Sequence, residues 1–212
     1  MEEFRAAPPG KLCCVHGTGS VFRLSLRAAA HVLLGGVPLA LVDGTNRFDV
    51  YALAEFARRT ASSSGRRLMP DDLLRNIYIS RAFTCYQMEA AVTERLPAFL
   101  ARKGSPVAVI FGLLDTFYDE QAPLYEVRAS LRRVIAALHD MKRNNIAVLL
   151  ASQDMKPASK ERAGLFPQLA AAMDLVYAVT DTDQGSRMMP DMLPVRRTAP
   201  PLHDNRRLVL PG

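Results

Sequence analysis

A glycine-containing turn near the N-terminus has the composition best suited to chemistry, and residues 16–23 read HGTGSVFR. Gly17 and Gly19 would let backbone N–H groups approach a phosphate, and Ser20 adds a hydroxyl. A nucleotide-binding loop also needs a lysine for the phosphate oxygens and a following hydroxyl for magnesium. Both are missing at the required positions, so Arg23 would have to replace the lysine. Two interpretations stay open: a degenerate phosphate site, or a tight turn that binds no ligand.

The cysteines and histidines do not form a metal-binding pattern. The chain has three cysteines and four histidines, namely Cys13, Cys14, Cys85, His16, His31, His139 and His203. No pair of cysteines has a zinc-ligand spacing, and the histidines are too scattered to serve a metal or a nucleophile. We therefore expect reduced, buried thiols, structural histidines and no metal site.

Basic residues in two segments are candidates for DNA contact. The chain carries a net charge of +6, which permits phosphate binding without showing it. A loop at 154–162 supplies Lys156, Lys160 and Arg162, and a proline-rich C-terminal segment supplies Arg196 and Arg197. Backbone contacts of this kind would be sensitive to salt and blind to base sequence. The alternative is an ordinary solvated loop.

A second candidate surface combines aromatic and acidic residues. Residues 116–125 include Phe117 and Tyr118 beside Asp119 and Glu120. This mixture is poor chemistry for phosphates and is more typical of a protein contact. We therefore predict a partner-binding role for Phe117 and Tyr118, with packing beneath the loop as the alternative.

The elements that must position these residues alternate between apolar β-rich runs and longer helical patterns. The expected strands cover residues 11–16, 38–42, 76–80, 106–111, 146–151 and 174–180, and the main expected helices cover 22–34, 49–60, 84–101 and 124–142. Such alternation predicts an α/β fold with a mostly parallel central sheet and helices on both faces. We expect one domain over residues 1–212, with its core at about 11–180 and an irregular tail at 183–212 that begins with an edge hairpin.

Composition excludes several classes of protein. Hydrophobic residues make up 49% and charged residues 23% of the chain, which is ordinary for a globular domain. No apolar stretch reaches the length of about 20 residues that a membrane span needs, and the N-terminus does not have the order of a signal peptide. We therefore expect a soluble, cytoplasmic protein without membrane contact.

Three segments resemble the core of the RecA/RadA-type recombinase ATPases. Residues 41–48, LVDGTNRF, resemble the family's second core strand and its ending. Residues 72–83 together with Gln87 are similar to the stretch xxLxNIxxxRAxxxxxQ, and residues 146–153 resemble the strand that ends in a glutamine, here Gln153. The resemblance covers residues 11–180 and implies a RecA-like P-loop core whose nucleotide site would include Asp43 and Gln153. It also implies that the loops after the two central strands face DNA.

Departures from the family pattern affect its catalytic residues. The family's water-activating glutamate corresponds to Thr45, or to Asn46 if the register slips. Its magnesium-linked aspartate should end the strand at 106–111, but Asp115 comes about three residues late. The phosphate-binding lysine is missing as well. Because phosphoryl transfer depends on these groups, we expect no ATPase activity and no ATP or magnesium requirement. The alternative role for Asp43 is to hydrogen-bond the glycine-containing turn at 16–23 instead of serving catalysis.

Three hypotheses for function follow. The first is a non-catalytic RecA-like protein of DNA repair, recombination or the damage response, which contacts a recombinase or polymerase, with DNA as a further ligand and with homo- or hetero-oligomers. The second is a nucleotide-dependent ATPase that uses Arg23 for the lysine and Asp115 for the metal ligand. The third is a regulatory protein of the circadian or signalling RecA-like type.

Overall fold

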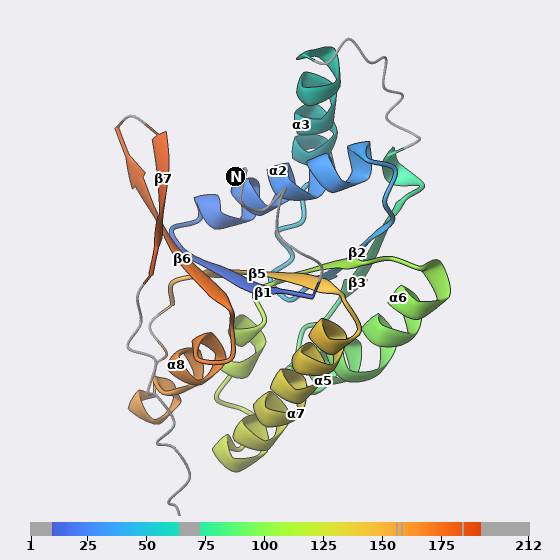
Figure 1. The fold of residues 1–212 in the computed structure, drawn as a ribbon. Coiled ribbons are helices and arrows are strands. Elements are labelled where there is room, and N and C mark those ends of the chain that lie inside the picture. The colour runs from blue at the N-terminus through green and yellow to red at the C-terminus, as the bar shows by residue number, and fades with distance from the viewer. Residues whose placement is uncertain (1–9, 64–72, 156, 158, 184, 192–212) are drawn as a thin grey trace, which may run out of the picture.

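The computed structural model describes residues 10–63, 73–155, 157, 159–183 and 185–191. Its centre is a seven-stranded sheet in the order β3-β2-β4-β5-β1-β6-β7 (Figure 1). The strands are β1 (Leu12–Gly17), β2 (Leu39–Asp43), β3 (Ile77–Arg81), β4 (Val107–Phe111), β5 (Ala147–Gln153), β6 (Leu175–Thr182) and β7 (Gly185–Pro190). All neighbouring pairs are parallel except β6 and β7, which form an antiparallel hairpin. The predicted α/β class with a mostly parallel sheet is confirmed.

Helices cover both faces of this sheet. The α2 helix (Ser20–Leu34) and the α3 helix (Val50–Ser63) pack on one face. The other face carries α5 (Cys85–Ala90), η1 (Ala91–Arg95), α6 (Leu96–Lys103), α7 (Leu124–Arg143) and α8 (Leu165–Ala170) (Figure 1). Two short 3₁₀ helices, η2 (Leu114–Phe117) and η3 (Lys160–Arg162), lie in connecting segments.

Side chains of the central strands alternate between two cores, as the two-residue period of a strand requires. In β1, Leu12 and Cys14 belong to the core beneath α5–α8, whereas Cys13 and Val15 belong to the core beneath α2 and α3. Because both faces are covered, every residue of β1 is buried. This explains why the sequence of the central strands is apolar throughout.

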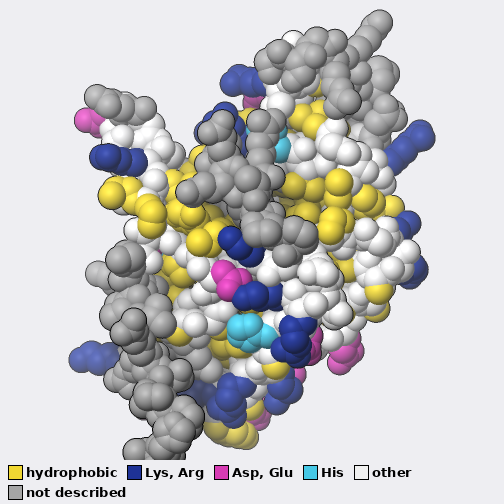
Figure 2. Space-filling model, in the orientation of Figure 1, with side chains coloured by type: hydrophobic (Ala, Val, Ile, Leu, Met, Phe, Trp, Pro, Cys, Tyr) yellow, Lys and Arg dark blue, Asp and Glu magenta, His cyan; other side chains and the backbone are white. Residues whose placement is uncertain are grey.

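Within the described residues, the chain passes from β6 directly into β7. No helix between these two strands therefore covers the hairpin on the side of α2. An apolar pocket of about 350 Å³ remains there, lined by residues such as Leu24, Ala28, Tyr177 and Met188. Hydrophobic side chains gather beside this hairpin in the space-filling view (Figure 2). Among the described residues, none of the helices combines the length and the apolar character required to cross a bilayer.

One helix differs from the expectation in an informative way. Pro97 lies inside the predicted helix at 84–101, where a proline would strain or shorten the last turn, but the helix runs on to Lys103. A π-helical turn, η1, precedes the proline instead. Because proline lacks an N–H and its ring clashes with the carbonyl four residues earlier, a wider turn at this point lets the helix continue.

Candidate functional site

The carboxyl edge of the parallel strands is where an α/β sheet normally binds ligands, at points where neighbouring strands lead to opposite faces. Three such points exist here. The strands β1 and β2 lead into α2 and α3 on one face, whereas β3, β4 and β5 lead into α5, α7 and α8 on the other. Crevices are therefore expected between β1 and β5, between β2 and β4 and between β2 and β3.

The turn after β1 is short and closes against β6. Only Thr18 and Gly19 separate β1 from α2. Gly17 has a φ of +133°, and a Cβ atom at this position would lie 2.0 Å from the carbonyl oxygen of Val179. The backbone N–H of Thr18 donates to that same oxygen at 3.1 Å. Glycine is thus required here for a close backbone approach, and the first N–H of the turn is already paired.

A carboxylate occupies the N-terminal end of α2. The Ser20 hydroxyl donates to Asp181 Oδ1 at 2.6 Å, and the Ser186 hydroxyl donates to the same oxygen at 2.8 Å. The Thr18 and Ser20 hydroxyls lie 2.9 Å apart. Hydrogen bonds from Ser20, Ser186 and Thr18 hold the pKa of Asp181 below its ordinary value, which keeps it ionised. The turn therefore has an anion from its own chain at the place where a helix N-terminus would attract a phosphate.

Gln153 and Arg23 are the other predicted nucleotide-site residues near this turn. A Cβ atom on Gly19 would approach Gln153 Nε2 to 4.0 Å, so the structure brings Gly17, Gly19, Ser20 and Gln153 together. Arg23 is exposed in the first turn of α2. Whether any of these residues binds nucleotide stays a prediction.

Asp43 is buried at the end of β2 and organises the loop that follows it. Its Oδ1 accepts the backbone N–H and the hydroxyl of Thr45, each at 2.9 Å, and the N–H of Arg47 at 3.4 Å. Its Oδ2 accepts the N–H of Phe48 at 3.0 Å. Two strands, β4 and β5, separate β2 from β1 in the sheet. The carboxylate thus shapes its own loop, residues 44–48, whereas the sequence placed its hydrogen bonding at the turn after β1.

Asp115 lies in η2, at the crevice between β2 and β4. A Cβ atom on Gly112 would approach both Thr45 and Asp115, which places these residues side by side. The Oδ1 atom of Asp115 is buried and has no hydrogen-bond partner among the described residues. Burial raises the pKa of Asp115, and the nearby Arg47 opposes that shift. In the described part of the chain, no three acidic, histidine or cysteine side chains are arranged to hold a metal ion.

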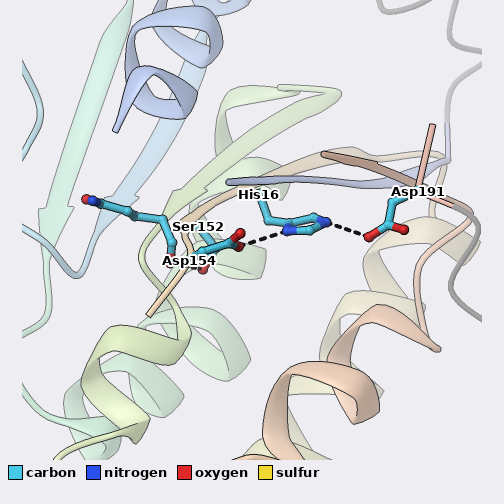
Figure 3. A network of polar contacts seen from close by, with 5 residues as sticks. His16, Ser152, Asp154 and Asp191 are labelled. Carbon is cyan, nitrogen blue, oxygen red and sulfur yellow. Dashed lines mark hydrogen bonds and ion pairs between the residues drawn. The ribbon is translucent and has the colours of Figure 1, made fainter. Parts of the chain in front are cut away.

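His16 joins three segments at the same edge (Figure 3). Its Nδ1 lies 2.9 Å from Asp154 Oδ1, directly after β5, and its Nε2 lies 2.8 Å from Asp191 Oδ2, directly after β7. The ring is 8% exposed and packs against Phe166 of α8 with the ring centroids 4.8 Å apart. Ionised carboxylates only accept hydrogen bonds, so both contacts are hydrogen bonds only when both ring nitrogens carry a hydrogen.

Sequence reasoning missed this cluster because its members are 138 and 175 residues apart. The only local signal was an aspartate directly after an apolar strand, Asp154. A structural role for His16, as expected from the sequence, agrees with these contacts.

The predicted DNA-contact residues have different surroundings. Lys160 is exposed. Arg162 is only 4% exposed, and its guanidinium donates to the carbonyl oxygens of Phe117 at 2.6 Å and Ala122 at 2.5 Å. As placed, Arg162 supports a neighbouring loop and does not present its charge to DNA. Lys156, Arg196 and Arg197 lie outside the described residues.

The predicted partner-contact residues are mostly internal. Phe117 is completely buried, and Tyr118 packs half-buried against the same core. The alternative left open by the sequence, packing beneath the loop, describes Phe117. The exposed aromatics of this region are Phe83, Tyr86 and Tyr125, and of these only Tyr125 lies in the segment 116–125 that the sequence singled out.

Comparison with known proteins adds no identification. No family model matches the chain, and no curated protein is significantly similar to it.

Proposed function

We propose that this protein is a non-catalytic RecA-like protein that acts by binding, in DNA repair, recombination or the damage response. The observation that carries the proposal is the closed turn after β1. A phosphate at the N-terminus of α2 would have to displace the Asp181 carboxylate from the Ser20 hydroxyl, a contact of 2.6 Å. Like charges at such short range oppose one another, and because Asp181 is exposed, water and salt reduce this repulsion.

The RecA-like assignment rests on the sequence resemblance together with a compatible architecture. The three resembling segments correspond to β2 with its ending, to β3 with the start of α5, and to β5 with Gln153. Gln153 lies beside Gly19 of the first turn. A protein with this fold and without phosphoryl-transfer chemistry acts through binding energy alone. Its partners would be a recombinase or polymerase and, more weakly, DNA.

The alternative is an ATPase that uses Arg23 and Asp115. The raised pKa of Asp115 disfavours the ionised form that a magnesium ligand requires. Asp115 also lies beside Thr45 in the crevice between β2 and β4, and one strand, β5, stands between β4 and β1 in the sheet. The non-catalytic function is therefore the better supported of the two.

Calorimetric ATP titration and a phosphate-release assay on the purified protein test the proposal, with magnesium and with or without single-stranded DNA. We expect neither binding nor turnover in the wild type. The Asp181→Asn variant removes the competing charge, and Asp183→Asn in the same hairpin is its control. Binding gained only by Asp181→Asn would support the closed turn. ATP binding by the wild type would contradict it, and turnover lost on Asp115→Ala would establish the ATPase.

A further inference from the structure

Three large aromatic side chains are exposed near the start of two helices. Tyr125 in the first turn of α7 is 72% exposed, Tyr86 in the first turn of α5 is 48% exposed, and Phe83, just before α5, is 65% exposed. Single exposed aromatics are common on proteins. Here, however, the two tyrosines come from different elements and meet at one carboxylate, that of Glu126. We call Phe83, Tyr86, Tyr125 and Glu126 the aromatic cluster.

Hydrogen bonds hold the two tyrosines in place before any partner binds. The Tyr86 hydroxyl donates to Glu126 Oε2 at 2.5 Å, and the Tyr125 hydroxyl donates to Oε1 at 2.9 Å. The bond to Glu126 raises the pKa of Tyr86 to about 12, and the bonds from both tyrosines lower the pKa of Glu126. The carboxylate thus stays ionised between two oriented rings. Side chains restrained in this way lose less conformational entropy when they bind.

The backbone beneath the cluster is also anchored. The buried guanidinium of Arg162 bonds to the carbonyl oxygens of Phe117 and Ala122, at the two ends of the loop that leads into α7. This loop carries Asp119 and Glu120, both exposed. The loop therefore places two acidic side chains directly before α7, the helix that carries Tyr125 and Glu126.

Three nearby arginines contact their own chain, whereas Arg132, two turns after Tyr125 on α7, is exposed. Arg133 forms an ion pair with Glu89, Arg95 donates to the carbonyl oxygen of Gln87, and Arg128 donates to the carbonyl oxygen of Glu161. The cluster accordingly combines aromatic faces with ionised carboxylates. A guanidinium matches both, because it stacks on aromatic rings and bonds to carboxylates through a planar fork. A phosphate backbone would be repelled by the same carboxylates.

We propose that the aromatic cluster is a docking surface for an arginine-bearing segment of a partner protein. The inference rests on the proposed binding function and gives its partner a chemistry. It also relocates the partner contact of this region from Phe117, which is buried, to Tyr86 and Tyr125. An arginine would place its guanidinium against the tyrosine rings, and Asp119 and Glu120 would attract further basic residues of the segment.

The test uses isotope-labelled full-length protein and a synthetic tetra-arginine peptide, followed by shifts of backbone amide resonances. Tetra-lysine and tetra-glutamate peptides are the chemical controls. We expect shifts at residues 83–87 and 124–127, with tetra-arginine bound more tightly than tetra-lysine. Tyr86→Ala and Tyr125→Ala should each weaken binding about two- to fivefold, the range for a cation–π contact at an exposed site. Glu126→Gln should weaken it through loss of charge.

Tyr51→Ala is the matched control, because Tyr51 is 84% exposed on α3, on the opposite face of the sheet. Equal binding of arginine and lysine peptides, or equal losses in Tyr51→Ala and Tyr125→Ala, would overturn the proposal. The proposal would also be overturned if sedimentation showed that the wild type self-associates and that Tyr125→Ala does not. The ATP measurements do not involve this surface, so failure here leaves the non-catalytic proposal standing, and ATP turnover would overturn that proposal without affecting the peptide result.

Discussion

Asp43 and Asp115 are neighbouring aspartates at the carboxyl edge of the sheet, and they differ in how far hydrogen bonds compensate the burial of their carboxyl groups. Asp43 accepts hydrogen bonds from Thr45, Arg47 and Phe48, so its burial is compensated. Asp115 is half-buried, and its Oδ1 atom is buried without a hydrogen-bond partner among the described residues. A buried group of the second kind costs free energy in the folded state, and proteins retain such groups most often at functional sites.

This difference predicts opposite effects of one substitution at the two positions. Asp115→Asn should raise the thermal midpoint at neutral pH, because it removes a carboxylate that burial disfavours. Asp43→Asn should lower the midpoint, because its amide nitrogen would face backbone donors. Differential scanning calorimetry measures both. A lower midpoint for Asp115→Asn would show that its charge is compensated in the folded protein.

The pH dependence of the Asp115 effect has a definite sign. Burial raises the pKa of this carboxyl group in the folded state, so the folded protein binds the proton more tightly than the unfolded chain. Stability is therefore lost as the pH rises from about 4, the ordinary value for aspartate, through the folded pKa. The advantage of Asp115→Asn should be largest at neutral pH and should shrink as the pH falls toward about 4.

Among the helices, α5 begins at the residue where the local sequence places an N-cap. Thr84 and Gln87 have capping-box spacing, and the Thr84 hydroxyl accepts the N–H of Gln87 at 3.2 Å. The Gln87 side chain accepts the N–H of Phe83 at 2.9 Å, one residue before the cap. The cap fixes where α5 begins, and with it the position of Tyr86 in its first turn.

Thr84→Ala should therefore destabilise the protein by about 1 kcal/mol, the usual cost of losing an N-cap side chain. Urea unfolding monitored by circular dichroism measures this change. Thr93→Ala in the π-turn is the matched control, because the Thr93 hydroxyl only bonds back to the carbonyl oxygen of Glu89. Such a bond contributes little to a helix, so this variant should be close to neutral. Equal losses in the two variants would argue against capping as the cause.

At the scale of the whole molecule, His16 connects the centre of the sheet with its edge. Asp154 follows β5 and Asp191 follows β7, so one ring links β1 to two segments that are distant in sequence. The N–H of Asp191 also donates to the carbonyl oxygen of Val176 in β6 at 2.8 Å. The edge hairpin thus has a side-chain anchor at its end in addition to its strand pairing.

His16→Ala should remove this anchor and cost about 1–3 kcal/mol, since it deletes the polar contacts of the ring with both carboxylates while leaving the carboxylates within reach of water. Hydrogen exchange followed by mass spectrometry should show faster exchange in β7 and at the end of β6, with α7 unchanged. His139→Ala, a half-buried histidine on α7, is the control. Unchanged exchange in the hairpin would show that strand pairing alone holds the edge.

Local patterns in the sequence were enough to predict the order and approximate bounds of the elements. Apolar runs, glycines and the cap at Thr84 are local features, and local periodicity follows directly from strand and helix geometry. The predicted strand at 106–111 corresponds to β4, and the predicted helix at 124–142 corresponds to α7. The closed turn after β1 also had a local signal, which was the glycine at position 17. The residue of β6 that Gly17 contacts had no such signal.

Which side chains meet depends on the tertiary arrangement of the strands and helices. The insertion of β1 between β5 and β6 brings Asp181 to the start of α2 and places His16 between two distant carboxylates. Likewise, the 3₁₀ turn η2 directs Phe117 into the core, whereas Tyr125 on the following helix remains in solvent. The physical reason is that side-chain burial in loops depends on long-range packing, whereas the period of a pattern depends only on neighbours along the chain.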